Sequence, residues 1–168
     1  MQIGPVVLNS MNNKVETAVA IFEYEPAYQP WFEKFNRDWI EKFFSMEPLD
    51  YMILQNPEEN IIRKGGSIFM ASYYGELAGT VALKFISPGV YELTKMAVDE
   101  KFQGKKIGRA LAEAAIARAR EASAVKVILY SNTMLQPALA LYNKLGFREI
   151  PLDGPYKRTD IKMELLLA

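Results

Sequence analysis

The 168-residue sequence contains no cysteine and no histidine. Their absence excludes zinc sites built from Cys and His, cysteine nucleophiles, disulfide bonds and Ser-His-Asp catalysis. An enzyme with this composition has to move protons with Asp, Glu, Tyr, Lys or water. The lack of cysteine also fits a cytoplasmic protein, which is the location we expect.

The sequence also lacks an excess of either charge and any long apolar run. The 20 basic and 20 acidic residues balance, so no basic face for nucleic acid is indicated. No segment approaches the roughly 18 apolar residues of a membrane span, and the N-terminus does not resemble a secretory signal. We therefore expect a single domain over 1–168 without nucleic-acid or membrane partners. Residues 1–13, which contain Met11, are expected to be an extension.

Half of the residues are apolar, and their spacing predicts alternating strands and helices. Strands are predicted at 19–24, 67–74, 77–86, 90–98, 125–131, 147–150 and 160–167, and helices at 27–44, within 46–62, after Gly104, and at 134–146. The three consecutive strands with short turns imply an antiparallel meander, whereas a strand, a crossover helix and a strand imply a parallel pair. The predicted fold class is α/β, with a mixed, largely antiparallel sheet and helices on both faces.

The junction between the strand at 90–98 and the next helix reads "QGKKIG", residues 103–108. A helix N-terminus with glycine and basic residues can hold a phosphate, because its backbone N–H groups are unpaired. The hexamer matches neither a nucleotide P-loop nor a dinucleotide fingerprint. Alone, it fits a phosphate site or a helix start with solvated lysines.

The surrounding sequence gives this junction a context. In order come "TKMAVDEKFQGKKIGRAL", a buried strand ending in "SNT", and "ALALYNKLGF". This order resembles the GNAT superfamily of acyl-CoA-dependent N-acetyltransferases, over about 67–167 and most strongly over 92–147. The family motif is Arg or Gln, two residues, Gly, one residue, then Gly or Ala. Gln103 and Gly108 match its ends.

Lys106 stands where the family motif has its first glycine. Lysine does not readily adopt positive φ, so we expect the loop to be helical by Lys106, with its N–H still facing phosphate. We also expect the side chains of Lys105, Lys106 and Arg109 to add positive charge for the phosphates of coenzyme A.

The resemblance implies acetyl-CoA as co-substrate, no metal, and a splay between the fourth and fifth strands that admits the cofactor. The residues implied in cofactor binding are Met96, Ala97 and Val98 through their backbone, then Gln103, Gly104, Lys105, Lys106, Ile107, Gly108, Arg109, Asn132 and Tyr142. Asn132 fits a cofactor contact, a cap for the following helix, or both.

Two residues are candidates for proton transfer. By resemblance Tyr142 is the general acid that protonates the departing thiolate; alternatively it only packs on its helix with Ala138 and Leu145. Glu92 is the candidate base, because strand alternation would place it on one face with Thr94, Met96 and Val98. The alternative is a carboxylate near solvent at a strand end. The N–H of Val98 would stabilise the oxyanion.

The acceptor is not identified beyond a primary amine of a small molecule or peptide. Glu47 and Asp50, beside Trp39 and Tyr51, either hold a cationic amine or form a solvated acidic loop. The leading interpretation is an N-acetyltransferase that works by direct attack in a ternary complex. The alternative is a non-catalytic acyl-CoA-binding sensor or interaction module on the same fold. The oligomeric state is open, with a homodimer among the options.

Overall fold

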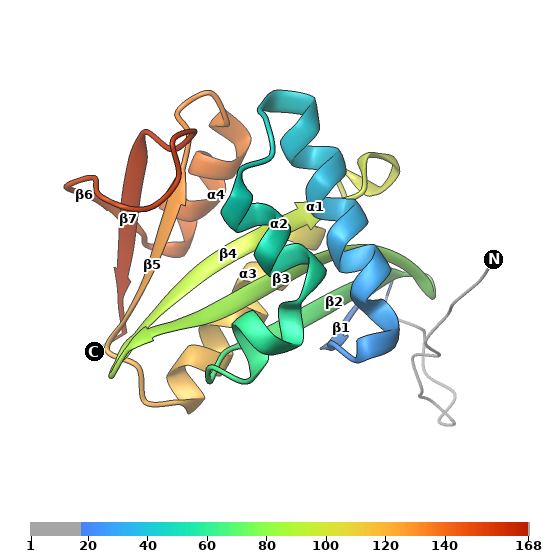
Figure 1. The fold of residues 1–168 in the computed structure, drawn as a ribbon, viewed down its shortest axis with the longest axis horizontal. Helices are drawn as coiled ribbons and strands as arrows, with labels where there is room; N and C mark the ends of the chain where they lie inside the picture. The colour runs from blue at the N-terminus through green and yellow to red at the C-terminus, as the bar shows by residue number, and fades with distance from the viewer. Residues whose placement is uncertain (1–17, 168) are drawn as a thin grey trace.

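The computed structural model describes residues 18–167, which form one seven-stranded sheet in the order β1-β2-β3-β4-β5-β7-β6 (Figure 1). Neighbouring strands are antiparallel except for the parallel pair β4–β5. The predicted extension at 1–13 lies outside the described residues. The strands are β1 (Val19–Glu23), β2 (Ser67–Tyr73), β3 (Glu76–Ser87), β4 (Val90–Val98), β5 (Lys126–Ser131), β6 (Arg148–Ile150) and β7 (Ile161–Leu166).

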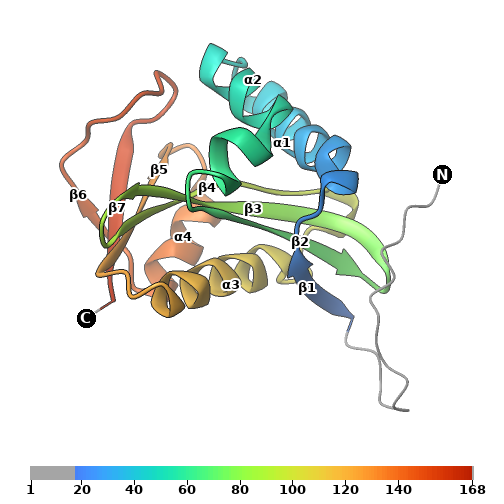
Figure 2. The ribbon, with the colours of Figure 1, turned by 60° about the horizontal axis from the view of Figure 1, so that its bottom comes forward.

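Helices cover both faces of this sheet (Figure 2). One face carries α1 (Gln29–Phe43) and α2 (Pro48–Gln55), and the other carries α3 (Ile107–Glu121) and α4 (Gln136–Leu145). Single-turn helices are η1 (Pro26–Tyr28), η2 (Glu58–Ile62) and η3 (Glu100–Phe102). The predicted mixed α/β fold and the order of its elements are confirmed. Among residues 18–167, no helix combines the length and apolarity needed to cross a membrane.

Local sequence explains where several elements begin and end. The β2–β3 hairpin turns at Tyr74 and Gly75, which both have positive φ (47° and 84°), as a tight hairpin turn that matches strand twist requires. Pro137 lies in the first turn of α4, where its missing N–H has no helical partner to lose. Gly146 ends the same helix at φ 100°, a left-handed cap that glycine adopts without strain.

The sheet separates two apolar layers. Beneath α3 and α4 the buried residues include Leu83, Leu93 and Leu111, and beneath α1 and α2 they include Phe32 and Ala97. Each large side chain removed from water in these layers stabilises the fold by about 1.5–3 kcal/mol. The two layers hold β4 from both sides.

A β-bulge interrupts β4 where it crosses the middle of the sheet. Ala82 of β3 pairs with Thr94, but Thr80 pairs with Ala97, so two residues of β4 oppose one of β3. Lys95 lies at this step with φ 52°. The extra residue shifts the alternation of β4 by one position.

The bulge overturns the prediction that Glu92, Thr94, Met96 and Val98 share one face. Met96 and Val98 pack against the layer beneath α3 and α4. Glu92 is the β4 partner of Lys84 on β3. Lys84 lies two residues from Ala82, which is buried beneath α1 and α2, so the side chain of Glu92 also faces α1 and α2. Strand alternation alone cannot anticipate this shift, because a bulge is set by the pairing partner.

Candidate functional site

A cleft opens where β4 and β5 separate. Their parallel pairing is limited to three rows and ends at Glu92 with Ile128. Beyond this apex the two strands diverge, as the expected splay requires, and the cleft between them encloses about 1410 Å³. Its walls come from α1, the second half of β4, the loop before α3, the end of β5, α4 and the β6–β7 loop (151–160).

The second half of β4 turns backbone groups toward this cleft. Ala97 pairs with Thr80, and the N–H of Asp99 donates to the carbonyl of Ala78, so Ala97 and Asp99 use their backbone groups on β3. By alternation, the backbone groups of Met96 and Val98 point away from β3 and into the cleft. They are available to a ligand that binds like an added strand, whereas those of Ala97 are already paired.

The loop from Gln103 to Arg109 forms one end of the cleft. All of its predicted cofactor residues line the cleft except Lys105, whose Nζ lies 5.7 Å from the ring centre of Tyr73. A Cβ atom added to Gly108 would meet only two side chains, each at ordinary contact distance, so its backbone is open to the cleft. The loop therefore has room for a phosphate group at the start of α3.

The expectation that Lys106 is helical is wrong. Lys106 caps α3 in the left-handed conformation, with φ 62° and ψ 23°, and the helix begins only at Ile107. Together with Gly104, at φ 78°, it folds the chain from an extended residue into the helix within three positions. A single left-handed residue costs a non-glycine side chain about 1–2 kcal/mol, which the rest of the fold outweighs.

Tyr142 projects from α4 and also lines the cleft. Its ring packs edge-to-face on Phe147, with ring centres 5.9 Å apart, and the residue is 8 % exposed. Burial raises the pKa of the Tyr142 phenol to about 12. The phenol is therefore protonated at neutral pH and can act as a proton donor. Tyr142 thus packs in the buried layer that Ala138 and Leu145 border, and its acid role stays a prediction.

Glu92 lies at the apex of the cleft and is 6 % exposed, so it is not a carboxylate near solvent at a strand end. Burial raises the pKa of its carboxyl group, and the nearby charges of Lys84, Lys95 and Lys162 oppose this shift. Among the described residues it forms no ion pair. A buried carboxylate with a raised pKa can accept a proton from a ligand in the cleft.

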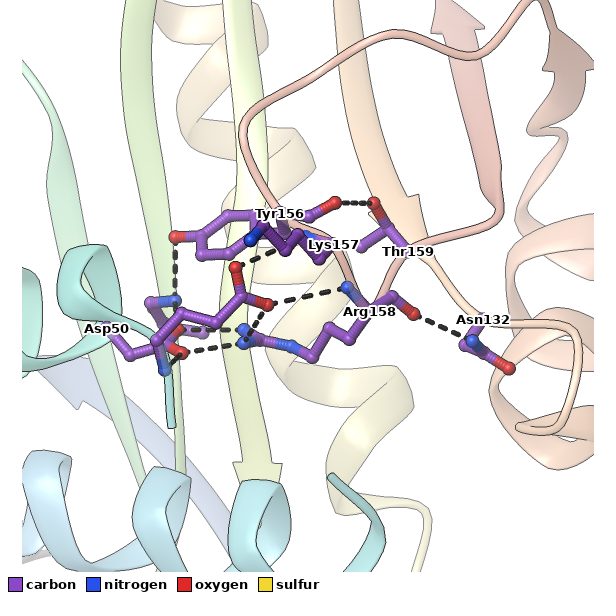
Figure 3. Close-up of polar contacts among 8 residues, drawn as sticks. Asp50, Asn132, Tyr156, Lys157, Arg158 and Thr159 are labelled. Carbon is purple, nitrogen blue, oxygen red and sulfur yellow. Dashed lines mark hydrogen bonds and ion pairs between the residues drawn. The ribbon is translucent and has the colours of Figure 1, made fainter. Parts of the chain in front are cut away.

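Beside Glu92, a buried polar network joins α2, β4 and the β6–β7 loop (Figure 3). Asp50 is its centre, with a side chain that is fully buried. Its Oδ1 accepts hydrogen bonds from Lys95 Nζ at 2.7 Å and Arg158 Nη2 at 2.8 Å, and its Oδ2 accepts from Arg158 Nη1 at 2.6 Å. The backbone N–H of Glu47 donates to Oδ2 at 2.8 Å.

Both residues expected in an acidic segment therefore have other roles. Glu47 caps α2, with Asp50 completing a reciprocal capping box, and accepts hydrogen bonds from the backbone N–H groups of Lys157 and Arg158. Burial alone would raise the pKa of Asp50, but hydrogen bonds from Arg158 and the charge of Lys95 lower it to about 2. Neither a solvated acidic loop nor a pair of free carboxylates is present.

Tyr156 brings the β6–β7 loop onto the cleft. Its hydroxyl accepts a hydrogen bond from Lys95 Nζ at 2.9 Å, and the cations of Lys95 and Arg158 each lie 4.5 Å from its ring centre. Tyr156, Lys95 and Arg158 all line the cleft. The loop is thus fixed as a wall of the site.

Asn132 follows β5 and lines the cleft, but it does not cap α4, whose N-cap is Leu135. Its Oδ1 instead accepts from the N–H of Met134, which closes a local turn, and its Nδ2 donates to the carbonyl of Arg158 at 2.7 Å. Asn132 therefore anchors the β6–β7 loop to the end of β5 (Figure 3).

Lys95, Tyr156 and Arg158 were missed by the sequence reasoning. The one available signal was a lysine within the otherwise apolar run "TKMAV". Burying such a charge is costly without a partner, so a partner could have been expected but not located. Tyr156 and Arg158 lie in "PYKRTD", a polar segment that carries no periodic pattern.

Comparisons with known proteins agree with this geometry. The sequence model of the acetyltransferase (GNAT) family matches residues 26–147. The chain is 30% identical to an uncharacterised N-acetyltransferase of Chlorobaculum tepidum over 99 residues, 59% of this chain; the match spans 61% of that relative. A GNAT-family acetyltransferase of Staphylococcus aureus Mu50 is similar in fold, with a TM-score of 0.81, 24% identity, and coverage of 90% of this chain and all of that chain.

A further solved structure is PaiA N-acetyltransferase of Thermoplasma acidophilum in complex with coenzyme A. Its TM-score is 0.70 at 18% identity, with 89% of this chain and 99% of that chain covered. At this level of identity the likeness concerns the fold.

Proposed function

Because the chain belongs to the GNAT family of acetyltransferases, we propose that it transfers the acetyl group of acetyl-CoA to a primary amine by direct attack in a ternary complex. The observation that carries this proposal is the cleft at the splay of β4 and β5, with Glu92 at its apex and Tyr142 on its α4 wall. Direct attack needs no nucleophilic side chain, in keeping with a sequence that has no cysteine and no histidine.

Coenzyme A would bind along β4 and at the loop before α3. The backbone groups of Met96 and Val98 would pair with the pantetheine amides, and the loop 103–109 would hold the phosphates at the start of α3. The structural neighbour from Thermoplasma acidophilum was solved with coenzyme A, which supports this assignment. The thioester of acetyl-CoA would supply the activated acetyl group.

Glu92 serves as the base in this proposal. Its buried carboxyl faces the α1 and α2 side of β4, on which the acceptor would lie, and has a raised pKa. It would accept the proton that the attacking amine loses, directly or through a water. The rate should then fall with decreasing pH through a pKa above the ordinary 4.5 of a glutamate, because protonated Glu92 is no base.

Tyr142 and Val98 would act on the thioester side. The phenol of Tyr142, which is protonated at neutral pH, would donate its proton to the departing sulfur. The N–H of Val98 points into the cleft and would donate a hydrogen bond to the developing oxyanion.

Replacing Tyr142 by Phe tests the proposal. The variant removes one hydroxyl while keeping the ring against Phe147, so kcat should fall by roughly 10²-fold or more. The affinity for acetyl-CoA should stay within a factor of about two, since packing and backbone contacts are unchanged. Steady-state kinetics by thiol release, together with a binding titration, measure both quantities.

Tyr91→Phe is the matched control, because Tyr91 lies on β4 and packs on Phe85, outside the residues that line the cleft. It should retain the rate of the wild type. If Tyr142→Phe also turns over at that rate, the acid is water or another residue and this part of the proposal fails. Acetyl-CoA binding without turnover of any amine would instead favour a non-catalytic acyl-CoA-binding protein.

A further inference from the structure

We propose that the acceptor is a primary amine with one positive charge and an uncharged, apolar body. This inference rests on the proposed acetyl transfer and assigns its substrate class. It excludes two amine classes that carry a second charge. Polyamines would need a second free carboxylate in the site to pair with their second ammonium group. Amino acids would need a free cation in the site to pair with their carboxylate.

The carboxylates near Glu92 are already occupied. Both oxygens of Asp50 accept hydrogen bonds from Lys95 and Arg158 at 2.6–2.8 Å, and Oδ2 also accepts the N–H of Glu47. Both oxygens of Glu47 accept from the backbone of the β6–β7 loop at 3.2–3.4 Å. A second ammonium group on the substrate would find no free carboxylate in this network and would enter a buried site unpaired.

The cations of the network are occupied as well. Lys95, whose side chain is 3 % exposed, donates to Asp50 and to the hydroxyl of Tyr156. Arg158 makes a bidentate pair with Asp50 and a further contact with Glu47, and its side chain is 12 % exposed. A substrate carboxylate would therefore have to displace an internal partner to be bound.

Glu92 remains as a buried carboxylate that forms no ion pair within residues 18–167. The charges of Lys84, Lys95 and Lys162 act on its carboxyl group, but none of these three lysines forms an ion pair with it. One carboxylate at the apex of the cleft matches one ammonium group. The charges of the neighbouring network, which consists of Asp50, Glu47, Lys95 and Arg158, sum to zero and pair with one another. The network therefore has no unpaired charge for a second charged group on the substrate.

Two further carboxylates of α1 line the cleft, Asp38 and Glu41, and they pair with Lys34 and Arg37 of the same helix. Aromatic side chains also line the acceptor side. Trp39, Phe43 and Phe44 cluster at the end of α1, with ring centres 6.0–6.4 Å apart, and all three line the cleft. The network residues Lys95 and Arg158 line the same cleft. Tyr130 and Tyr156 line the cleft from β5 and the β6–β7 loop. An apolar body gains about fourfold in affinity for each methylene group buried on such a surface.

Two matched pairs of amines test the inference on the wild-type protein with acetyl-CoA. Hexylamine and 1,6-diaminohexane differ by one ammonium group, and 2-phenylethylamine and phenylalanine differ by one carboxylate. In each pair we expect the first amine to have the higher kcat/KM, by about 10-fold or more, because the second charge is buried without a partner. Equal or higher kcat/KM for 1,6-diaminohexane or phenylalanine would overturn the inference.

Arg158→Gln tests the network directly, since it frees part of Asp50 for a second ammonium group. The ratio of kcat/KM for 1,6-diaminohexane over hexylamine should rise by about fivefold or more. Arg148→Gln is the control: Arg148 pairs with Glu164 on the outer strands, and its loss should leave the ratio unchanged. An unchanged ratio in a folded Arg158→Gln protein would contradict the assigned role of the network.

Failure of the inference can be told from failure of the proposed function. Turnover that favours the doubly charged amines overturns the substrate class and leaves acetyl transfer standing. No turnover of any of the four amines, in a protein whose Tm rises with acetyl-CoA, overturns both. The wild-type comparison decides the substrate class even where Arg158→Gln does not fold.

Discussion

At the scale of single residues, Lys106 has a left-handed backbone conformation, which is strained for a residue with a Cβ atom. Lys106→Gly should raise the free energy of unfolding by up to about 1 kcal/mol. The gain comes from relief of a left-handed strain of about 1–2 kcal/mol, partly offset by the greater freedom of glycine in the unfolded chain. Urea unfolding of the wild type and the variant measures the difference.

Lys105→Gly is the control for this prediction, because the neighbouring Lys105 has no positive φ. Its replacement should lower the free energy of unfolding. Glycine at this position relieves no backbone strain, and it loses more conformational entropy on folding than lysine does. A Lys106→Gly protein that is as unstable as Lys105→Gly would mean that Lys106 carries no strain.

For single residues, the sequence predicted which side chains line the site better than it predicted their backbone conformation and contacts. It indicated that Glu92 and Tyr142 belong to one site, and both line the cleft. It predicted a helical backbone at Lys106, because the general preference of lysine for negative φ was applied to this one position. A preference of about 1–2 kcal/mol is small against the interactions that fix a loop, so it cannot decide a single residue.

At the scale of elements, the buried pairing of Asp50 ties α2 to β4 and to the β6–β7 loop. Its folded-state pKa of about 2 lies below the unfolded value near 3.9, so the ionised carboxylate stabilises the fold. The contribution, on the order of 2 kcal/mol, is complete above about pH 4 and is lost as the pH falls through about 2.

Asp50→Asn should therefore remove this acid-dependent part of stability. At neutral pH it should also cost about 3–5 kcal/mol, because Lys95 and Arg158 would be left buried beside a neutral group. Tm measured from pH 2 to pH 7 gives both effects. Asp38→Asn, at an exposed pair with Lys34, is the control and should change little. A wild-type profile identical in shape to that of Asp50→Asn would contradict the assigned pKa.

The elements themselves were predictable, and their deviations were not. Apolar spacing after Gly104 predicts a helix, and the continuous apolar run at 125–131 predicts a buried strand; the structure has them at Ile107–Glu121 and Lys126–Ser131. The bulge at Lys95 depends on how β3 pairs with β4, and the network depends on Arg158 reaching Asp50 from 108 positions away in sequence. Such contacts exist only after the chain has folded.

At the scale of the whole molecule, the cleft lies between elements from both halves of the chain, so a ligand in it should stabilise the entire fold. Acetyl-CoA at a hundredfold excess over its Kd should raise the free energy of unfolding by about 2.7 kcal/mol. For a protein of this size the Tm should rise by roughly 5–10 °C. ATP at the same concentration should do much less. A thermal titration with no dependence on acetyl-CoA concentration would contradict the cofactor assignment.

The short parallel pairing of β4 and β5 leaves an internal sheet edge, bordered by helices rather than by another strand. The amide protons of Met96 and Val98 point into this edge, while that of Asp99, almost next to them, is held by the carbonyl of Ala78. Neighbouring amides of one strand should therefore exchange with deuterium at very different rates. A pantetheine chain bound along β4 would slow the exchange of the Met96 and Val98 amides. Their exchange rates would therefore report whether the cofactor is bound.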